Sequence, residues 1–426
     1  MIVALALACT STTTVGMDPD TSPPRAEDTA HELPGDTSAT DTAEPDDPAD
    51  REKPTAPVQV VLECPGPLQI DVDIPCEGEL SWPDGEPEAQ GTVKVHIRGR
   101  SSSSFPKPQY KLEFIGDDLE PAPVELFGMG RESDWVLNGM WIDRAMIRNR
   151  FAWDLFNTLS RGVDRAPESV YAELTLDGEY QGLYLLDETI DRDGSRLDFA
   201  EDDGSGARFL VHADDEDGIT SPLQYGRWAL DYPGDATAAQ RAGVAEHLGA
   251  WEDAIQGRGS PWDHMDLDSF VLFLLVEELM KNNDGYFLSH RVWRGEDAML
   301  RMVPWDLDLT LGQPNYNDNW LSSGWIYYRS DLVADSADAE LRQALAARWR
   351  EGRAGELADE ALLARMQALR DEMGDAADRN WERWDISTVD FYGYLTPIDD
   401  PEVEWAAIER WLPERTAWID ANIEDF

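Results

Sequence analysis

The stretch "NNDGYFLSHRVWRGEDAMLRMVPWDLD", from Asn282 to Asp308, decides the predicted fold. It contains two apolar segments on either side of a short polar turn, which is the pattern of a two-stranded hairpin. Asp284 precedes the first predicted strand, and Asp306 and Asp308 follow the second. Because the outer ends of a hairpin lie side by side, we expect these carboxylates to meet in one pocket.

Simpler interpretations of these aspartates stay open at this stage. Asn-Asp-Gly is a frequent turn sequence, so Asp284 taken alone also fits a turn before a strand. Asp308 lies on the same side of an extended chain as Asp306, because side chains alternate along a strand with a period of two. Either residue could therefore bind a metal ion, and Asp308 also fits a solvated strand end.

Composition limits the classes of function. The chain has 426 residues, 42% of them hydrophobic, which is enough for one large domain or two lobes. Lys and Arg number 35 against 86 Asp and Glu, which gives a formal net charge of -51. Such a charge repels nucleic-acid phosphates and anionic lipid headgroups. We therefore expect no nucleic-acid partner, and contact with a membrane only through a lipid anchor.

The first nine residues, MIVALALAC, resemble a lipoprotein signal. An apolar run with small residues precedes Cys9, which is the pattern of a cysteine that becomes lipidated. Ala6 stands where leucine is usual, and no basic residue precedes the apolar run. A ragged cytoplasmic terminus is the alternative interpretation. The lipoprotein interpretation places the protein in the cell envelope or outside the cell, anchored by a lipid on Cys9.

Residues 10–57 are rich in Thr, Asp, Pro, Glu and Ser and contain almost no large apolar side chain. Such a segment cannot bury enough surface to offset its ordering entropy, so we predict a disordered acidic linker. The folded domain is predicted to span residues 58–426. Near its start, Cys64 and Cys76 flank a strand-like alternation. In an exported protein a disulfide between them is the simplest interpretation, and two buried free thiols are the alternative.

Hydrophobic patterning predicts strands in the first part of the domain and helices in the last. Period-two alternation indicates strands in residues 91–100 and 110–116, and a hairpin that turns at Asp177-Gly178. Helical spacing indicates helices in residues 143–162 and 267–283, and three more after Asp338. We expect Asp268 or Ser269 to cap the second of these helices.

The order of these elements suits phosphoryl transfer from a nucleotide. That chemistry needs a cation and backbone donors for the phosphates, a carboxylate for Mg²⁺, and a second carboxylate near the attacking hydroxyl. Here a Ser-rich loop with Lys107 is followed by a helix, a hairpin, a second helix, Asp284 and then Asp306. This order matches the layout of a protein kinase, although the kinase consensus strings themselves are absent.

Several segments in this order resemble the spore coat protein H (CotH) kinase family, an atypical branch of the protein-kinase-like fold. The resemblance extends from about Val58 to the C-terminus and rests on IRGRSSSSFPKPQYKLEF, MIRNRFAWDLF, LDGEYQGLYLLDETID, NNDGYFLSHRVWR, MVPWDLDLTLG and IERWLPERTAWIDANI. It implies an α+β, two-lobed protein-kinase-like fold. The β-rich N-terminal lobe would comprise residues 58–190, and the helical C-terminal lobe residues 191–426.

The resemblance also implies roles for three residues. Asp284 matches the catalytic aspartate, Asp306 the magnesium aspartate, and Lys107 the lysine that contacts phosphate. Asp284 would orient the acceptor hydroxyl and take its proton, while Asp306 would hold a metal ion that bridges phosphate oxygens. The implied cofactors are ATP and Mg²⁺ or Mn²⁺. The implied reaction transfers the γ-phosphoryl group to a hydroxyl of an unidentified protein substrate.

Other residues are candidates for binding the nucleotide. Arg98 and Ser102 offer a guanidinium and a hydroxyl to a triphosphate, although a Ser run is also common in plain linkers. Asp154 is a candidate carboxylate partner for Lys107, and ordinary surface charges are the alternative for both. Glu188 falls where the connector between lobes should pass the adenine. A glutamate at a strand end is, however, commonly just exposed.

One departure from the family pattern bears on activity. Where an asparagine is usual as second metal ligand, five residues after the catalytic aspartate, this chain has Ser289. A hydroxyl is a weaker neutral ligand than an amide carbonyl, so metal affinity or turnover should be reduced. Two functions remain: an envelope-anchored protein kinase, or a non-catalytic kinase-fold surface protein for adhesion or partner binding.

Overall fold

A computed structural model describes residues 52–162, 164–213, 218–220, 227–282, 284–314, 320–385, 389, 393 and 395–426. The predicted signal with Cys9, and the predicted linker up to residue 51, lie outside the described residues, so both stay predictions. The first described strand begins at Val58. Within the described ranges, no helix is both long enough and apolar enough to cross a membrane.

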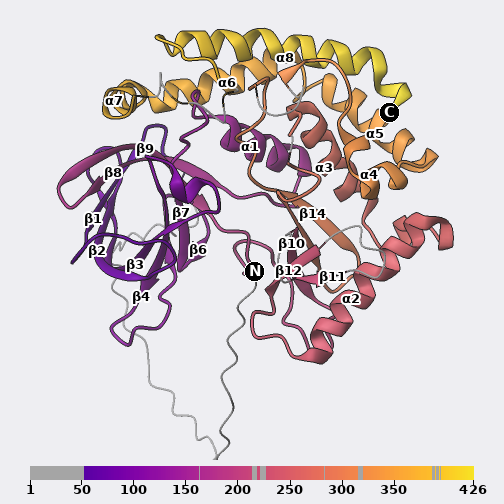
Figure 1. The fold of residues 1–426 in the computed structure, drawn as a ribbon, viewed down its shortest axis with the longest axis horizontal. Coiled ribbons are helices and arrows are strands. Elements are labelled where there is room, and N and C mark those ends of the chain that lie inside the picture. Colours follow the sequence, from indigo (N-terminus) through magenta and orange to yellow (C-terminus); the bar gives the residue numbers. More distant parts are fainter. Residues whose placement is uncertain are drawn as a thin grey trace, which may run out of the picture. The chain divides into compact units, whose positions relative to one another are not determined.

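The first part of the described chain forms a closed seven-stranded barrel, in which neighbouring strands follow the order β1-β2-β3-β4-β7-β9-β8 (Figure 1). The strands are β1 (Val58–Glu63), β2 (Ile74–Ser81), β3 (Pro87–Arg98), β4 (Gln109–Ile115), β7 (Asp134–Asn138), β8 (Ser169–Leu176) and β9 (Glu179–Glu188). The pair β1 and β8, which closes the barrel, is parallel, and the other neighbours are antiparallel. Alternate side chains such as Val58, Val60 and Leu62 fill the interior, as the strand period requires.

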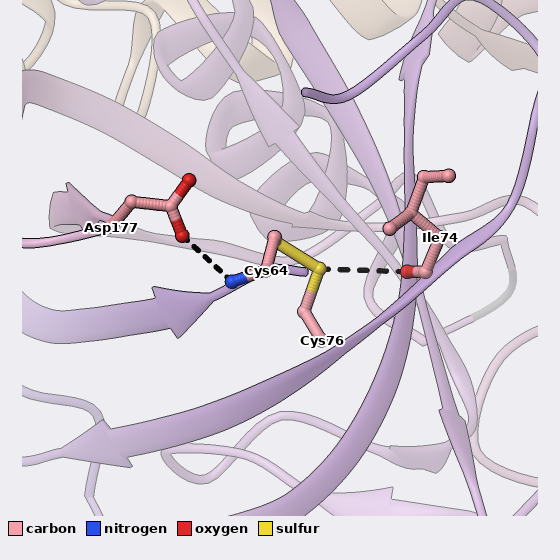
Figure 2. The surroundings of a disulfide bond; sticks show 4 residues. All are labelled: Cys64, Ile74, Cys76 and Asp177. Atoms are coloured by element: carbon pink, nitrogen blue, oxygen red, sulfur yellow. Dashed lines mark hydrogen bonds between the residues drawn. A yellow bond between two sulfur atoms is a disulfide. The ribbon is translucent and has the colours of Figure 1, made fainter. Parts of the chain in front are cut away.

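Two local predictions in the barrel are confirmed. Asp177 and Gly178, with φ of 50° and 76°, form the turn between β8 and β9, a conformation typical of a two-residue hairpin loop. Cys64 and Cys76 form a disulfide with 4.3 Å between their Cα atoms. The backbone N–H of Cys64 donates to the Asp177 carboxylate at 2.7 Å, so the bridge is tied to this turn (Figure 2). The disulfide therefore joins β1, β2 and the β8–β9 hairpin at one end of the barrel.

A second, five-stranded sheet has the order β11-β12-β10-β13-β14. Its strands are β10 (Phe209–Ala213), β11 (Ile219–Thr220), β12 (Arg227–Tyr232), β13 (His290–Arg294) and β14 (Leu300–Pro304), and a separate short pair comprises β5 (Val124–Glu125) and β6 (Arg131–Glu132). The predicted hairpin is the antiparallel pair β13–β14, with His290 opposite Pro304. The segment expected to be a helical lobe thus contains a sheet as well as helices.

The described α-helices are α1 (Arg148–Ser160), α2 (Ala238–Asp253), α3 (Leu267–Met280), α4 (Asp331–Ser336), α5 (Ala339–Arg353), α6 (Asp359–Met373), α7 (Asp375–Arg383) and α8 (Glu402–Asn422) (Figure 1). The α+β class is confirmed, with strands first and helices toward the C-terminus. The two-lobed, protein-kinase-like arrangement stays a prediction.

Helix α3 is the central helix of the larger hydrophobic core. It is apolar on all sides and buried from Ser269 to Met280, as expected of a helix surrounded by other elements. Its N-cap is Asp266, whose carboxylate accepts from the Ser269 N–H at 3.0 Å, and not the predicted Asp268 or Ser269. Because α3 is fixed by packing on all sides, the chain that leaves its C-terminus starts from a rigid base.

Candidate functional site

The open end of the β13–β14 hairpin borders a cavity of about 630 Å³. Asp284, Asp306 and Asp308 all line this cavity, so the expectation that the three carboxylates meet in one pocket is confirmed. Arg98 and Ser102 line it as well. The volume lies in the range typical of small-molecule sites.

Asp284 is positioned by the end of α3. Lys281 terminates the helix in the left-handed conformation (φ 52°), and its Nζ donates to the carbonyls of Leu321 at 2.9 Å and Ser323 at 2.6 Å. The carbonyl of Asp284 then accepts from the N–H groups of Leu288 at 3.0 Å and Ser289 at 3.2 Å. These bonds form a tight turn that leads directly into β13.

Asp306 follows β14 in a conformation that sequence alone did not indicate. The N–H of Trp305 donates to the Ser289 carbonyl at 3.0 Å, which places the two strand ends together. Asp306 has φ of 53°, a left-handed conformation that aspartate tolerates better than most residues. The period-two argument for Asp308 is therefore wrong, because the chain is not extended here. Asp308 reaches the cavity because the Leu307 N–H donates to Asn149 Oδ1 at 2.6 Å.

The carboxylates concentrate negative charge in a buried place. Burial raises the pKa of Asp306, and the charge of Asp284 raises it further. Burial and then Asp306 raise the pKa of Asp308 well above its usual value, so the protonation of the two carboxyl groups is linked. Like charges held this close favour either a shared proton or a bound cation.

The donor set fits a hard divalent cation that also binds phosphate. Asp306 and Asp308 supply carboxylate oxygens, which Mg²⁺ prefers over nitrogen or sulfur. Over the described ranges, no three His, Cys, Asp or Glu side chains are arranged to enclose a metal ion. Magnesium commonly uses one or two carboxylates together with substrate phosphates, so two protein carboxylates are sufficient for that type of site.

Two arginines supply positive charge opposite these carboxylates. The guanidinium carbons of Arg98 and Arg291 lie 5.8 and 5.5 Å from the ring centroid of Trp305, and all three residues line the cavity. Burial lowers the pKa of Arg98 and Arg291 lowers it further, while Asp306 opposes the shift. An arginine stays charged despite such shifts. The pair is therefore suited to bind a polyanion such as a phosphate group.

The Ser-rich loop is an ordered turn at the edge of the cavity. Residues Ser102–Ser104 form a short 3-10 helix, and the Ser104 hydroxyl donates to the Ser101 carbonyl at 2.7 Å. Gly99 has φ of 108°, and a methyl group there would overlap the Ser102 hydroxyl. The loop is therefore not a plain linker, and its conformation brings Ser102 to the cavity together with Arg98.

Lys107 is not among the residues that line the cavity. It is 1% exposed, and its Nζ donates to the Leu183 carbonyl and to Asn380 Oδ1, the latter at 2.8 Å. The ammonium group also lies 4.5 Å from the ring centroid of Tyr184, and burial lowers its pKa. The structure therefore brings Lys107 neither to the phosphate site expected from the resemblance nor to the surface. Asp154, the candidate partner of Lys107, instead has its carboxylate 3.6 Å from Nε of Arg150.

Glu188 also lies away from the cavity. Its buried carboxylate accepts from Arg165 Nη2 at 2.9 Å and from the N–H groups of Gly130 at 3.1 Å and Glu168 at 2.9 Å. These bonds fix the end of β9, so the glutamate is not simply exposed. The preceding residue, Asp187, is buried, and Arg98 is among the charges that act on its carboxyl group.

Sequence reasoning missed several residues that line the cavity, including Arg291, Asn149, His212 and Trp305. A signal existed for Arg291, because it lies two residues after Ser289 and alternation places both on one side of the strand. No local signal marks Asn149 or His212. Asn149 is the second residue of α1, and His212 is in β10, so both reach the cavity through tertiary packing.

The family described as CotH kinase protein matches residues 95–419, which is most of the chain and includes every residue that lines the cavity apart from Asp71. No curated protein matches the chain.

Proposed function

The chain belongs to the CotH kinase protein family, and from this premise we propose that it transfers the γ-phosphoryl group of ATP to a hydroxyl of a protein, in an Mg²⁺-dependent reaction. One observation carries the proposal: the Asp284, Asp306 and Asp308 carboxylates and Arg291, from one stretch of the chain, line the same cavity as Arg98, from the distant strand β3. Phosphoryl transfer needs this combination, because the reaction depends on positioning and charge stabilisation more than on covalent chemistry.

Each of these cavity residues would have a separate role in the reaction. Asp306 and Asp308 would hold Mg²⁺, which when bound neutralises charge on the phosphate oxygens. Arg98, Arg291 and the Ser102 hydroxyl would bind the remaining phosphate oxygens. Asp284 would accept a hydrogen bond from the acceptor hydroxyl and take its proton as the new P–O bond forms and the bond to ADP breaks.

A binding experiment tests the metal half of the proposal. The wild-type protein should show a thermal shift with ATP that depends on Mg²⁺ or Mn²⁺, and Asp306→Ala should lose that dependence. Asp268→Ala is a matched control, because Asp268 is an exposed acid at the start of α3 and does not line the cavity. Absence of any shift in the wild-type protein with ATP and either metal would contradict the proposal.

The second candidate function is a kinase fold used for adhesion or partner binding without catalysis. The observation that favours it is Ser289, which is buried at the cavity where the family has an asparagine. A serine hydroxyl is the poorer metal ligand. Transfer of radiolabelled phosphate by the wild-type protein, to itself or to a mixture of Ser-, Thr- and Tyr-containing peptides, would decide against this alternative.

We also propose that the protein is anchored in the cell envelope by a lipid on Cys9. The Cys64–Cys76 disulfide supports an oxidising compartment, since such bridges are rare in the cytosol. Cells that express the full gene with labelled fatty acid should incorporate label, and Cys9→Ala should abolish it. Unchanged labelling of the Cys9→Ala variant would contradict the anchor.

A further inference from the structure

A carboxyl group with no role in the proposed reaction lies directly behind Asp284. Glu277, near the C-terminus of α3, is 0% exposed. Its carboxyl oxygens have no hydrogen-bond partner among the described residues. The charges that act on it come from Glu278 and Asp284, and no arginine or lysine is among them. The buried Arg415 lies 3.4 Å from the Glu278 carboxylate instead.

Glu277 contacts the segment that carries Asp284. A methyl group on Gly285 would overlap Oε2 of Glu277, so the carboxyl group packs directly on the Gly285 backbone. The Asn282 side chain also faces Glu277. That same side chain accepts from the Asp284 N–H at 3.3 Å and donates to the Asp306 carbonyl at 3.4 Å. Glu277 therefore supports the two backbone positions at which the catalytic and metal-binding aspartates leave their elements.

The surroundings of Glu277 favour its neutral form. Burial raises the pKa of Glu277 well above its usual range, the nearby Asn282 amide opposes this, and the charges of Glu278 and Asp284 raise the pKa further. Tyr286, the other titratable group that faces Glu277, is also buried. A protonated Glu277 adds no second negative charge beside Asp284, so it fills the space without competing for a proton or a cation.

We propose that Glu277 is a positioning residue: its carboxyl group packs behind Gly285 and keeps the Asp284 carboxylate directed into the cavity. The inference rests on the proposed function, because it assigns Glu277 to the same reaction. Glu277 is not among the residues that line the cavity, so its effect must pass through the Asp284 segment. A neutral group of the same shape should therefore replace it, whereas a smaller one should not.

Kinetics of three variants test this inference. Glu277→Ala removes the support, so kcat for phosphate transfer should fall by about 10-fold or more, with KM and the Kd for Mg-ATP changed by less than about threefold. Glu277→Gln keeps shape and neutrality, so its kcat should stay within about threefold of wild type. Asp164→Asn is the matched control: Asp164 is another buried acid with unpartnered oxygens, it lies outside this cavity, and its kcat should not change.

A double variant keeps the test valid if Glu277→Ala is poorly folded. Gly285→Ala forces its new methyl group against Glu277, so it should lower kcat by itself. In the Glu277→Ala background the overlap is gone, and the same glycine substitution should cost clearly less. Additive effects of the two substitutions would contradict contact between these positions as the cause.

Thermal stability gives a readout that does not depend on catalysis. In the unfolded chain a glutamate loses its proton above about pH 4.3, whereas folded Glu277 keeps it, so wild-type stability should fall as pH rises from that value. Glu277→Gln lacks this penalty, and its melting temperature relative to wild type should rise steadily between pH 5 and pH 8. A gap that stays constant or shrinks over this range would mean that folded Glu277 is ionised and would overturn the inference.

The outcomes separate the inference from the proposed function. A wild-type protein that transfers no phosphate under any metal condition contradicts the proposed function, and with it the role of Glu277. A wild-type protein that transfers phosphate, with Glu277→Ala equal to it in kcat, contradicts the inference alone. If Glu277→Gln loses as much activity as Glu277→Ala, the carboxyl group itself is required and the positioning role is again overturned.

Discussion

Two regions of the molecule bury charge in opposite ways. At the end of β13–β14, Asp284, Asp306 and Asp308 repel one another and face an open cavity. Inside the domain, Lys107 is a single cation whose hydrogen bonds are supplied by a backbone carbonyl and an amide, with an aromatic ring beside it. The carboxylates raise one another's proton affinity at a cavity, whereas the hydrogen bonds of Lys107 are supplied within the fold. Unfavourable charge that faces a cavity therefore indicates a ligand, and satisfied buried charge indicates a structural role.

The largest expected effect is on phosphate transfer after substitution of Asp284, the proposed catalytic base among the three carboxylates. Asp284→Asn keeps the side-chain shape but removes the base, so phosphate transfer should fall about 10²-fold to 10⁴-fold. Nucleotide affinity should change by less than about threefold, because in the proposed reaction Asp284 would contact the acceptor and not the phosphates. Radiolabelled ATP and a binding titration with Mg²⁺ measure both quantities. Equal transfer by wild type and variant would mean that these carboxylates are structural.

The next effect distinguishes the two kinds of buried cation. Arg98→Ala should raise the Kd for Mg-ATP by about 10-fold or more, because a charge-assisted hydrogen bond contributes about 1.5–3 kcal/mol. Lys107→Met should leave that Kd within about twofold, because Lys107 does not line the cavity. Arg161→Ala, at the exposed end of α1, controls for loss of positive charge. A larger loss of affinity in Lys107→Met than in Arg98→Ala would mean that Lys107 contacts the phosphates.

The same contrast explains which features could be predicted from sequence. The β13–β14 hairpin pairs residues separated by a short turn, and alternation with a polar turn specifies such pairing locally. The two ends of the hairpin carry Asp284 and Asp306, so their proximity followed from the hairpin. The Cys64–Cys76 bridge was predictable for a similar reason, since only three cysteines exist and two of them lie 12 residues apart.

The position of Lys107 could not be predicted in this way. Its partner Asn380 is 273 residues away, in α7, and the other partner, Leu183, is in β9. Neither contact leaves a local pattern, and the flanking prolines fit a surface loop equally well. Asn149, which binds the Asp306–Asp308 segment through the Leu307 N–H, also makes its contact with a residue far away in the sequence. Contacts between distant elements depend on how whole helices and sheets pack, and one sequence does not specify that locally.

A third test concerns stability, and its expected effect is smaller. Lys107→Met removes the lysine donor from the Leu183 carbonyl and one of the two donors to Asn380 Oδ1, which should lower the free energy of unfolding by about 1–3 kcal/mol. Lys94→Met is the matched control, because Lys94 is a partly exposed lysine paired with Glu113 and such pairs contribute under about 1 kcal/mol. Equal destabilisation by both substitutions would contradict the structural role of Lys107.

The pH dependence of that effect has a defined sign. Burial lowers the pKa of Lys107 in the folded protein, whereas an unfolded lysine keeps its proton up to about pH 10.4. The unfolded chain therefore binds the extra proton, and wild-type stability should rise with pH toward about 10.4. Lys107→Met lacks this rise, so the difference in unfolding free energy between the two proteins should grow from pH 7 to pH 10. Denaturant titrations at several pH values measure it, and a constant difference would show that folded Lys107 stays protonated.

The smallest expected effect is tighter metal binding after substitution of Ser289, which lies at the end of the β13–β14 hairpin that carries the carboxylates. Ser289 is held in place because its carbonyl accepts from the Trp305 N–H, so Ser289→Asn should direct an amide carbonyl into the cavity without moving the backbone. An amide oxygen is the better metal ligand, and the Mg²⁺ concentration for half-maximal nucleotide binding should fall by about 3-fold to 10-fold.

Ser289→Leu is the control for that gain, because leucine has nearly the shape of asparagine but no ligand atom. It should not lower the Mg²⁺ requirement, and a similar gain in both variants would mean that side-chain volume, not coordination, causes it. An unchanged requirement in Ser289→Asn would place the metal away from the start of β13. A different cation or a shared proton would then have to balance the charge of the three carboxylates. Only Asp306 and Asp308 would then contrast with Lys107, whose hydrogen bonds are supplied within the fold.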